Sequence, residues 1–257
     1  MRLNCGMAHA SDKAELTEAG GKVRLYVSAD LATGAQVPLD QAQAHYLLHV
    51  MRARTGDLVS LFNGRDGEWL AEIASVSKKT LILSCRHRSA PQAAVPDIWL
   101  LFAPVKKTPA DYLTQKATEL GAAKLQPVFT RRTIVTRVNQ ERLLANAIEA
   151  AEQSGRLSVP EIGDATTLEK ALANWPKDRT LYFCDEGGNA KPLQTSAKPE
   201  PCAILTGPEG GFDPTERAML RALPFVVPVT LGPRILRADT AALAALSIWQ
   251  SNAGDWC

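Results

Sequence analysis

Two glycine-rich stretches in the C-terminal part of the chain carry residues that could hold a small ligand. The first, LTGPEGGFDPTE (205–216), follows an apolar run and contains three glycines around one carboxylate, Glu209. It fits neither common phosphate-binding pattern, because it lacks a terminal Gly-Lys-Ser/Thr and its glycines do not follow the order G-x-G-x-x-G. Glu209 would also repel a phosphate. The stretch therefore favours a neutral or cationic ligand, or else it is only a tight turn that needs glycine for positive φ.

The second stretch, LGPRILRADTAAL (231–243), also joins the end of an expected strand to an expected helix. Ligands of α/β domains bind at the carboxyl ends of the strands. The two stretches are therefore expected to lie together as the walls of one cleft, and this pairing is more specific than either stretch alone.

The elements that would position this cleft begin after Asp97, where the sequence alternates strand and helix patterns. IWLLFAP is a nearly continuous apolar strand, which a parallel sheet buries on both faces. This order indicates an α/β domain with a parallel sheet. The further strands expected are LQPVF, LYFCDE, CAILTG and FVVPVTLG.

Cap and stop residues predict the helices between these strands. One helix is expected after a Thr108 cap and is ended by Gly121, and another is expected after an Asp213 cap. A helix over 140–154 would bury a face made of Leu144, Ile148 and Ala151. A last helix over 240–250 would bury a face made of Ala242, Ala245, Leu246 and Trp249.

The front of the chain has a different pattern. RLYV, a hairpin of LVSLF and EWLAEIASV, and TLILSC are expected strands, and Asp40 is expected to cap a helix that runs to about Met51. SAPQAAVPD reads as a linker between the two parts. Residues 1–22 are expected to be a loose extension, because they contain no apolar signal-peptide core.

The composition of the 257 residues is that of an ordinary globular protein, with 46% hydrophobic and 22% charged residues. A net charge of +2 means that any RNA contact must come from local patches. The five cysteines are scattered without a CxxC pair, which argues against zinc and disulfides and fits a reducing cytoplasm.

Six stretches from residue 23 onward resemble motifs of one protein family, and they occur in the same order as in that family. They are RLYV, HYLLHVMRARTGD, ATELGAAKLQPVFTRR, AAEQSGRLSVPEI, LTGPEGGF and LGPRILRADTAAL. The chain resembles the 16S rRNA uridine-N3 methyltransferases (RsmE type) of the SPOUT superfamily. It departs from that family at Asp239, where glutamate is more common.

The resemblance implies an N-terminal PUA-like small β-barrel domain for RNA binding and a C-terminal α/β domain with a deep trefoil knot. The corresponding ranges are a flexible extension over 1–22, the barrel over 23–90 and the methyltransferase domain over 91–257. A homodimer that acts on 16S rRNA or the small ribosomal subunit is also implied, as is S-adenosylmethionine as the cofactor. In the family the two glycine-rich loops surround that cofactor with backbone groups. The implied cofactor-binding residues are Leu205, Thr206, Gly207, Pro208, Gly210, Gly211, Leu231, Gly232, Ile235 and Leu236.

Methylation of uracil N3 requires loss of the N3 proton, so the site must favour the anion. Arg237 is the first candidate to stabilise that anion or to clamp a phosphate, although it could simply be an arginine at a helix start. Glu209 could accept the proton or hold a ligand donor, and its alternative is a turn role. Arg156 is a third candidate, which could instead form an exposed ion pair with Glu152.

Five arginines are candidates for RNA contact: Arg52, Arg54, Arg65, Arg131 and Arg132. Glu119 is expected to need a cationic partner such as Arg131 or Arg132. His45 and His49 have a spacing that metal ligands use, but no third ligand follows nearby, so no metal is expected.

Two other functions compete with uridine-N3 methylation. One is another SPOUT activity on a tRNA base or a ribose 2′-hydroxyl, and the other is an RNA-binding adaptor without catalysis. The ELG, EQSGR and ILRADTA stretches argue against the first, and intact cofactor loops argue against the second.

Overall fold

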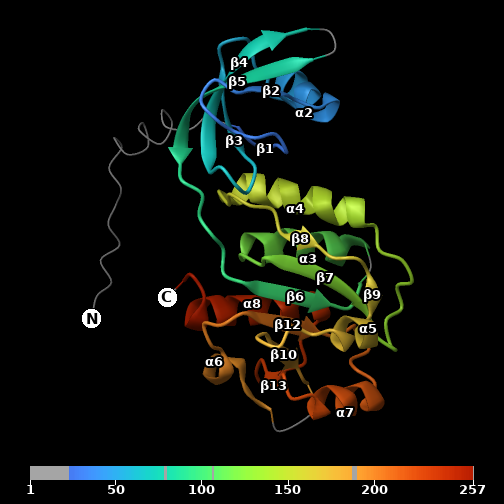
Figure 1. Ribbon diagram of the computed structural model, residues 1–257. Coiled ribbons are helices and arrows are strands. Elements are labelled where there is room, and N and C mark those ends of the chain that lie inside the picture. Colours follow the sequence, from blue (N-terminus) through green and yellow to red (C-terminus); the bar gives the residue numbers. More distant parts are fainter. Residues whose placement is uncertain (1–22, 78–79, 106, 187–189, 257) are drawn as a thin grey trace. The chain divides into compact units, whose positions relative to one another are not determined.

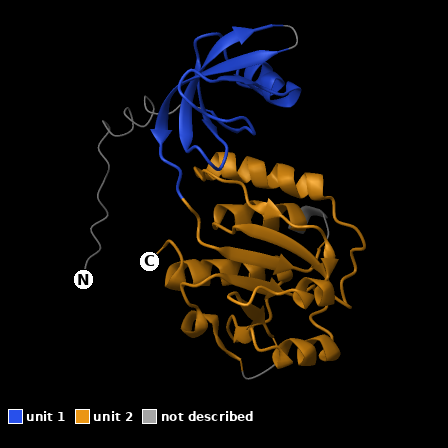
Figure 2. Ribbon diagram, in the orientation of Figure 1, with its two compact units in different colours: residues 1–93 blue, residues 94–257 orange. Residues whose placement is uncertain are grey.

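A computed structural model describes residues 23–256 except 78–79, 106 and 187–189. The extension expected over 1–22 lies outside the described residues. The chain forms two compact units, residues 1–93 and 94–257 (Figure 2).

The first unit contains one five-stranded sheet with the order β1-β3-β4-β5-β2. Its strands are β1 (Arg24–Tyr26), β2 (Gln36–Pro38), β3 (Leu58–Phe62), β4 (Glu68–Val76) and β5 (Leu81–Ala90). The expected hairpin is confirmed, because β3 and β4 pair antiparallel. The predicted linker is wrong at its first two residues, Ser89 and Ala90, since β5 continues through them and Ala90 pairs with Glu68.

The helical segment of this unit begins where it was expected. The side chain of Asp40 accepts a hydrogen bond from the Gln43 amide and starts α2 (Gln41–His45), which continues as a π-helical turn, η1 (Tyr46–Val50). The turn ends at Arg52, a residue other than glycine with a positive φ of 55°. A positive φ is conformationally unfavourable for a residue with a side chain, so the contacts of the surrounding turn must hold Arg52 in it.

The second unit is an α/β layer structure around a parallel sheet (Figure 1). Its strands have the order β11-β13-β10-β12-β6-β7-β8, and β9 pairs with β7 off this path. Every pairing among them is parallel. The strands are β6 (Ile98–Phe102), β7 (Lys124–Phe129), β8 (Glu161–Ile162), β9 (Thr166–Thr167), β10 (Thr180–Cys184), β11 (Lys191–Pro192), β12 (Cys202–Thr206) and β13 (Val226–Thr230).

Helices cover both faces of this sheet. They are α3 (Lys107–Glu119), α4 (Gln140–Ser154), α5 (Leu168–Ala173), α6 (Leu193–Ser196), α7 (Pro214–Ala222) and α8 (Ala238–Ala253). Alternate residues of β12 divide between the two cores: Ile204 packs with α3, α4 and α8, and Leu205 packs with α5 and α7. This two-sided burial explains the continuous apolar strands in the sequence.

The helix predictions are confirmed in part. The predicted apolar face of the last helix is buried, and Gly155 ends α4 in a left-handed conformation. The predicted face of α4 is confirmed at Ala151, which is buried, but it is wrong at Leu144, which is 43% exposed. Ile148 is half-buried, and the other buried residues of the helix are Leu143, Ala147 and Ala150. The helix expected after a Thr108 cap already includes Thr108, because α3 begins at Lys107. Glu119 pairs with Lys116 one turn earlier, not with Arg131 or Arg132.

No helix in the described part of the chain combines the length and the apolar character needed to cross a membrane.

Candidate ligand-binding cleft

A cleft lies at the carboxyl ends of β10, β12 and β13, and it brings the two glycine-rich stretches together. Both stretches line it, as their position after adjacent strand ends predicts. The predicted cofactor residues that line the cleft are Thr206, Gly207, Pro208, Gly211, Leu231, Gly232, Ile235 and Leu236. Two others are not among the lining residues: Leu205 is a fully buried core side chain, and Gly210 is exposed.

A third wall comes from the end of β10, for which the sequence predicts only a strand. Cys184, Asp185 and Glu186 line the cleft there. The sheet order explains this, because β10 lies between β12 and β13 and its end therefore falls between the two glycine-rich loops. Seven more lining residues were not among the predicted cofactor residues. Five of them belong to the two predicted stretches (Phe212, Pro233, Arg234, Ala238 and Ala241), and Val229 and Thr230 end β13.

Three of the glycines have a clear physical requirement. A Cβ at Gly207 would lie 2.6 Å from the ring of Phe212, and one at Gly211 would overlap the carboxylate of Glu186. Gly211 and Gly232 also have positive φ values of 67° and 121°. Gly210 has neither constraint, because its φ is not positive and a Cβ there would meet Arg132 only at 3.6 Å. In this turn a positive φ therefore requires glycine at position 211 and not at position 210.

A capping box fixes the first loop to α7. Asp213 accepts a hydrogen bond from the Thr215 amide at 2.9 Å, and Glu216 accepts one from the Asp213 amide at 3.2 Å. The hydrogen bonds from Thr215 hold the pKa of the Asp213 carboxyl below its usual value. The predicted cap is confirmed, and the loop therefore enters the helix in one defined direction.

The loop after β7 packs against this first loop. The Arg131 amide donates to Oε1 of Glu216 at 2.7 Å, and Nη1 of Arg132 donates to the Gly210 carbonyl at 3.0 Å. A longer ion pair of 3.6 Å joins Arg131 to Asp213. Two of the predicted RNA-binding arginines are thus exposed residues that contact the first glycine-rich loop.

The acidic residues of the cleft differ in their surroundings. The side chain of Asp185 is fully buried and forms ion pairs with Arg221 at 2.6 Å and Arg217 at 3.2 Å. The side chain of Glu186 is 44% exposed, and its ion pair with Arg217 is long, at 3.9 Å. Glu209 is exposed at the rim. Asp185 is therefore a neutralised structural anion, whereas Glu186 and Glu209 leave negative charge at the cleft.

Cys184 is half-buried at the cleft wall, and desolvation of its thiol by the surrounding residues raises its pKa to about 12, which makes it a poor nucleophile. The same cause raises the pKa of Cys202 to about 12.

The three predicted catalytic residues lie in two places. Glu209 lines the cleft, and Arg237 is an exposed residue between Leu236 and Ala238, which both line it. Arg237 occupies the N-cap of α8, but its side chain makes no capping hydrogen bond. The side chain of Arg237 therefore does not cap the helix, although its exposed position agrees with the alternative of a surface arginine at a helix start.

Arg156 lies away from the cleft of its own unit. Its Nη1 donates to the carbonyl of Thr118 in the last turn of α3 at 2.9 Å, and desolvation lowers its pKa to about 10. Because α3 runs from the carboxyl end of β6 to the amino end of β7, this turn lies at the amino ends of the strands, whereas the cleft lies at their carboxyl ends. Arg156 is thus a largely desolvated cation that hydrogen-bonds a carbonyl group of the last turn of α3.

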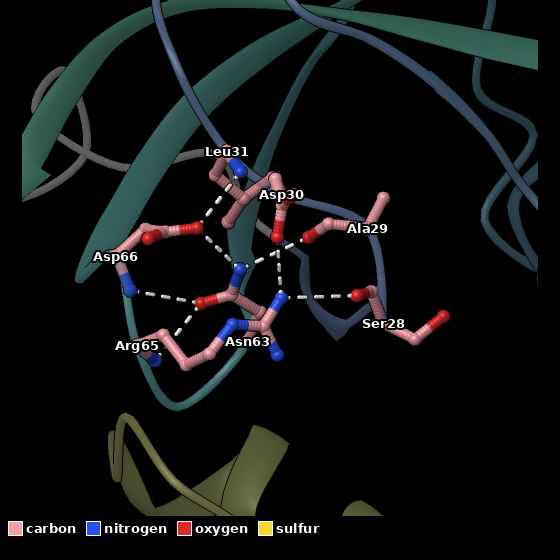
Figure 3. A network of polar contacts seen from close by, with 7 residues as sticks. All are labelled: Ser28, Ala29, Asp30, Leu31, Asn63, Arg65 and Asp66. Atoms are coloured by element: carbon pink, nitrogen blue, oxygen red, sulfur yellow. Dashed lines mark hydrogen bonds and ion pairs between the residues drawn. The ribbon is translucent and has the colours of Figure 1, made fainter.

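The other predicted RNA-binding residues belong to the first unit. Figure 3 shows Arg65 in a polar network, where its Nη2 donates to the Ser28 carbonyl at 3.1 Å and to Asp30 at 2.8 Å. Asn63 and Asp66 complete the network, and hydrogen bonds from the Leu31 amide and the Asn63 side chain hold the pKa of Asp66 below its usual value. Arg52 and Arg54 are located at the exposed turn after η1.

The rings of His45 and His49 are in contact at an interplanar angle of 40°, with their centroids 4.7 Å apart. Within the described residues, no group of three or more His, Cys, Asp or Glu side chains is arranged to hold a metal ion.

Comparison with known proteins identifies the class to which this fold and cleft belong. Residues 91–250 match the model of the RNA methyltransferase domain, and residues 39–84 match that of the RNA methyltransferase PUA domain. The chain therefore belongs to the RNA methyltransferase family.

Similar proteins share one particular name, ribosomal RNA small subunit methyltransferase E. The one from Rickettsia conorii is 32% identical over 87% of this chain and 93% of its own length. The one from Synechocystis is also 32% identical, over 87% of this chain and 76% of its own. A crystal structure of the Neisseria gonorrhoeae protein bound to S-adenosyl methionine has a TM-score of 0.84 at 28% identity, and the alignment covers 91% of this chain and 99% of that one.

Proposed function

We propose that this chain transfers the methyl group of S-adenosylmethionine to N3 of a uracil in 16S rRNA. The observation that carries the proposal is the likeness of nearly the whole chain to a structure with S-adenosyl methionine bound. The curated relatives are named for the RNA of the small ribosomal subunit, which supports the substrate class.

The residues of the cleft fit this cofactor. Gly207, Gly211 and Gly232 line the cleft without side chains, which suits an adenine read by backbone amides and carbonyls. Glu186 and Glu209 favour a cationic ligand over a phosphate. The bound cofactor supplies a methyl group that its positive sulfur already activates.

The protein must then orient the uracil and stabilise its deprotonated N3. We propose that Arg237 stabilises the N3 anion or contacts the adjacent phosphate, because its guanidinium makes no capping hydrogen bond to α8. We assign Glu209, exposed at the cleft rim, as the candidate acceptor of the N3 proton. Arg156 lies at the amino ends of the strands, away from the cleft, so we assign it no direct role in this subunit's reaction.

The assembly is also proposed by analogy with the family. We infer a PUA-like barrel over 23–90 that contacts RNA through Arg52, Arg54 and Arg65, and a knotted SPOUT domain over 91–257. A homodimer through the knotted domain is part of the same proposal. A cytoplasmic location follows from an rRNA substrate.

Mass-spectrometric mapping of 16S rRNA from cells with and without this protein tests the reaction. The proposal expects one N3-methyluridine that disappears with the protein. A lost methyl group on a ribose, or on a tRNA, would assign a different methyltransferase activity. Unchanged RNA, together with no calorimetric binding of S-adenosylmethionine, would favour the adaptor without catalysis.

A further inference from the structure

A second cavity of about 300 Å³ lies in the α/β unit, at the end of β6 and between the first residues of α3 and α4. Its floor is apolar and buried, with Phe102, Val105 and Leu143 all 5% exposed or less. Val135 and Val138, from the connection between β7 and α4, form a half-buried wall. This volume is at the lower end of the range for small-molecule sites.

The cavity is next to the cofactor cleft. Strands β6 and β12 pair side by side, with Phe102 opposite Thr206, and the Ala103 amide donates to the Thr206 carbonyl at 3.1 Å. Phe102 lines the second cavity, and Thr206 lines the cleft. The two sites therefore lie at the carboxyl ends of two neighbouring strands of one sheet.

The rim of the cavity carries positive charge. Arg142 is held by a two-point ion pair with Asp111, which also accepts a hydrogen bond from Asn146 at 3.0 Å. Arg137 is exposed, and no ion pair joins it to an acid in the described part of the chain. The same connection carries Arg131 and Arg132, so three exposed arginines lie within seven residues.

An apolar slot beside a cationic rim suits a nucleotide, whose flat base has apolar faces and whose phosphate is an anion. An enzyme that modifies a base must take it out of its stack, and it needs somewhere to hold unstacked bases. A free phosphate fits poorly, because the floor is apolar. We propose that this cavity binds one unstacked nucleobase of the RNA substrate, with the adjacent phosphate toward Arg137. The assignment rests on the proposed function.

A photo-crosslink tests the proposal without depending on turnover. The full chain is irradiated with a 16S rRNA transcript that contains 4-thiouridine, and crosslinked tryptic peptides are identified by mass spectrometry. Crosslinks are expected in the peptides 133–137 and 138–142, which contain both wall valines. Wild-type crosslinks that lie only elsewhere would overturn the assignment.

Two matched variants sharpen this test. Val135→Phe fills the cavity from its half-buried wall, and Leu144→Phe adds the same ring at an exposed position of α4 that does not line it. Val135→Phe should lower both the crosslink yield and the RNA affinity roughly tenfold, as expected when the binding of one base by the protein is lost. Leu144→Phe should change neither, and both variants should bind S-adenosylmethionine like the wild type.

Failure of the cavity and failure of the proposed function give different results. If Val135→Phe methylates 16S rRNA with unchanged KM and kcat, the reaction stands and the cavity assignment is wrong. If the wild type methylates no rRNA but the valine peptides crosslink, the reaction is wrong and the cavity is still an RNA site. If Val135→Phe only converts a dimer to a monomer in light scattering, the cavity is an interface between copies, which also overturns the assignment.

Discussion

The backbone amide of Arg131 donates a 2.7 Å hydrogen bond to Oε1 of Glu216, a carboxylate that is only 3% exposed. The other oxygen of Glu216 accepts from the Asp213 amide. One buried side chain thus joins the loop after β7 to the loop that lines the cleft.

Replacing Glu216 by alanine should loosen both loops at once. Two amides would lose their partner, at a cost of about 1–3 kcal/mol for each that stays buried. We expect a lower free energy of unfolding in urea and weaker S-adenosylmethionine binding by calorimetry. Glu149→Gln, at an exposed position of α4, is the control. Wild-type cofactor affinity in a folded Glu216→Ala protein would show that the two loops are independent.

Alanine at two adjacent glycines should have different effects. Gly211→Ala must adopt a φ of 67°, which costs about 1–2 kcal/mol, and its methyl group would overlap Glu186. We expect roughly a tenfold or greater loss of cofactor affinity. Gly210→Ala has ordinary contacts and should bind nearly as the wild type does, so equal losses in the two variants would contradict the geometry.

Arg237→Ala should reduce turnover far more than cofactor affinity. A lost charge partner for a developing anion costs about 10²-fold in kcat. Arg234→Ala is a useful comparison, because Arg234 lines the cleft and belongs to the same exposed turn. If Arg237→Ala weakens S-adenosylmethionine binding as much as it slows the reaction, Arg237 is a cofactor or structural residue.

The cleft cysteine should be chemically inert. At pH 8 a thiol with a pKa of about 12 has almost no thiolate, so Cys184 and Cys202 should react with iodoacetamide far more slowly in the native protein than in urea. Raising the pH toward 10 should leave this protection largely intact. Rapid labelling of native Cys184, followed by peptide mass spectrometry, would show that the cleft admits more water than its burial indicates.

The proposed homodimer needs a test that spares the core. Trp249 is 2% exposed and packs on its own sheet, so Trp249→Glu would unfold the unit rather than separate two subunits. Leu243 is half-buried on the same helix and outside the core clusters. Leu243→Asp should yield a folded monomer in light scattering, and a wild-type mass of 27.8 kDa would refute the dimer directly.

The sequence predicts what depends on local patterns. Caps, apolar runs and the two glycine-rich loops give the alternation of strands and helices, and Asp213 begins α7 as its box with Glu216 indicates. The order of strands in the sheet is not local, so Glu186 could not be placed between the two loops from its own neighbours. The face of α4 was misjudged because Leu143 and Leu144 are adjacent, and only packing against α3 decides which one is buried.

The sheet order also determines when this unit can fold during synthesis. The strand made first, β6, lies in the middle of the sheet and pairs on one side with β12, about a hundred residues later in the chain. At about 5–20 residues per second, a ribosome needs several seconds to supply that partner. Until then β6 presents an apolar edge, and closing such distant pairings is slow. The five-stranded unit at the front has all its strands by Ala90, so it can be folded before the methyltransferase sheet has its central pair.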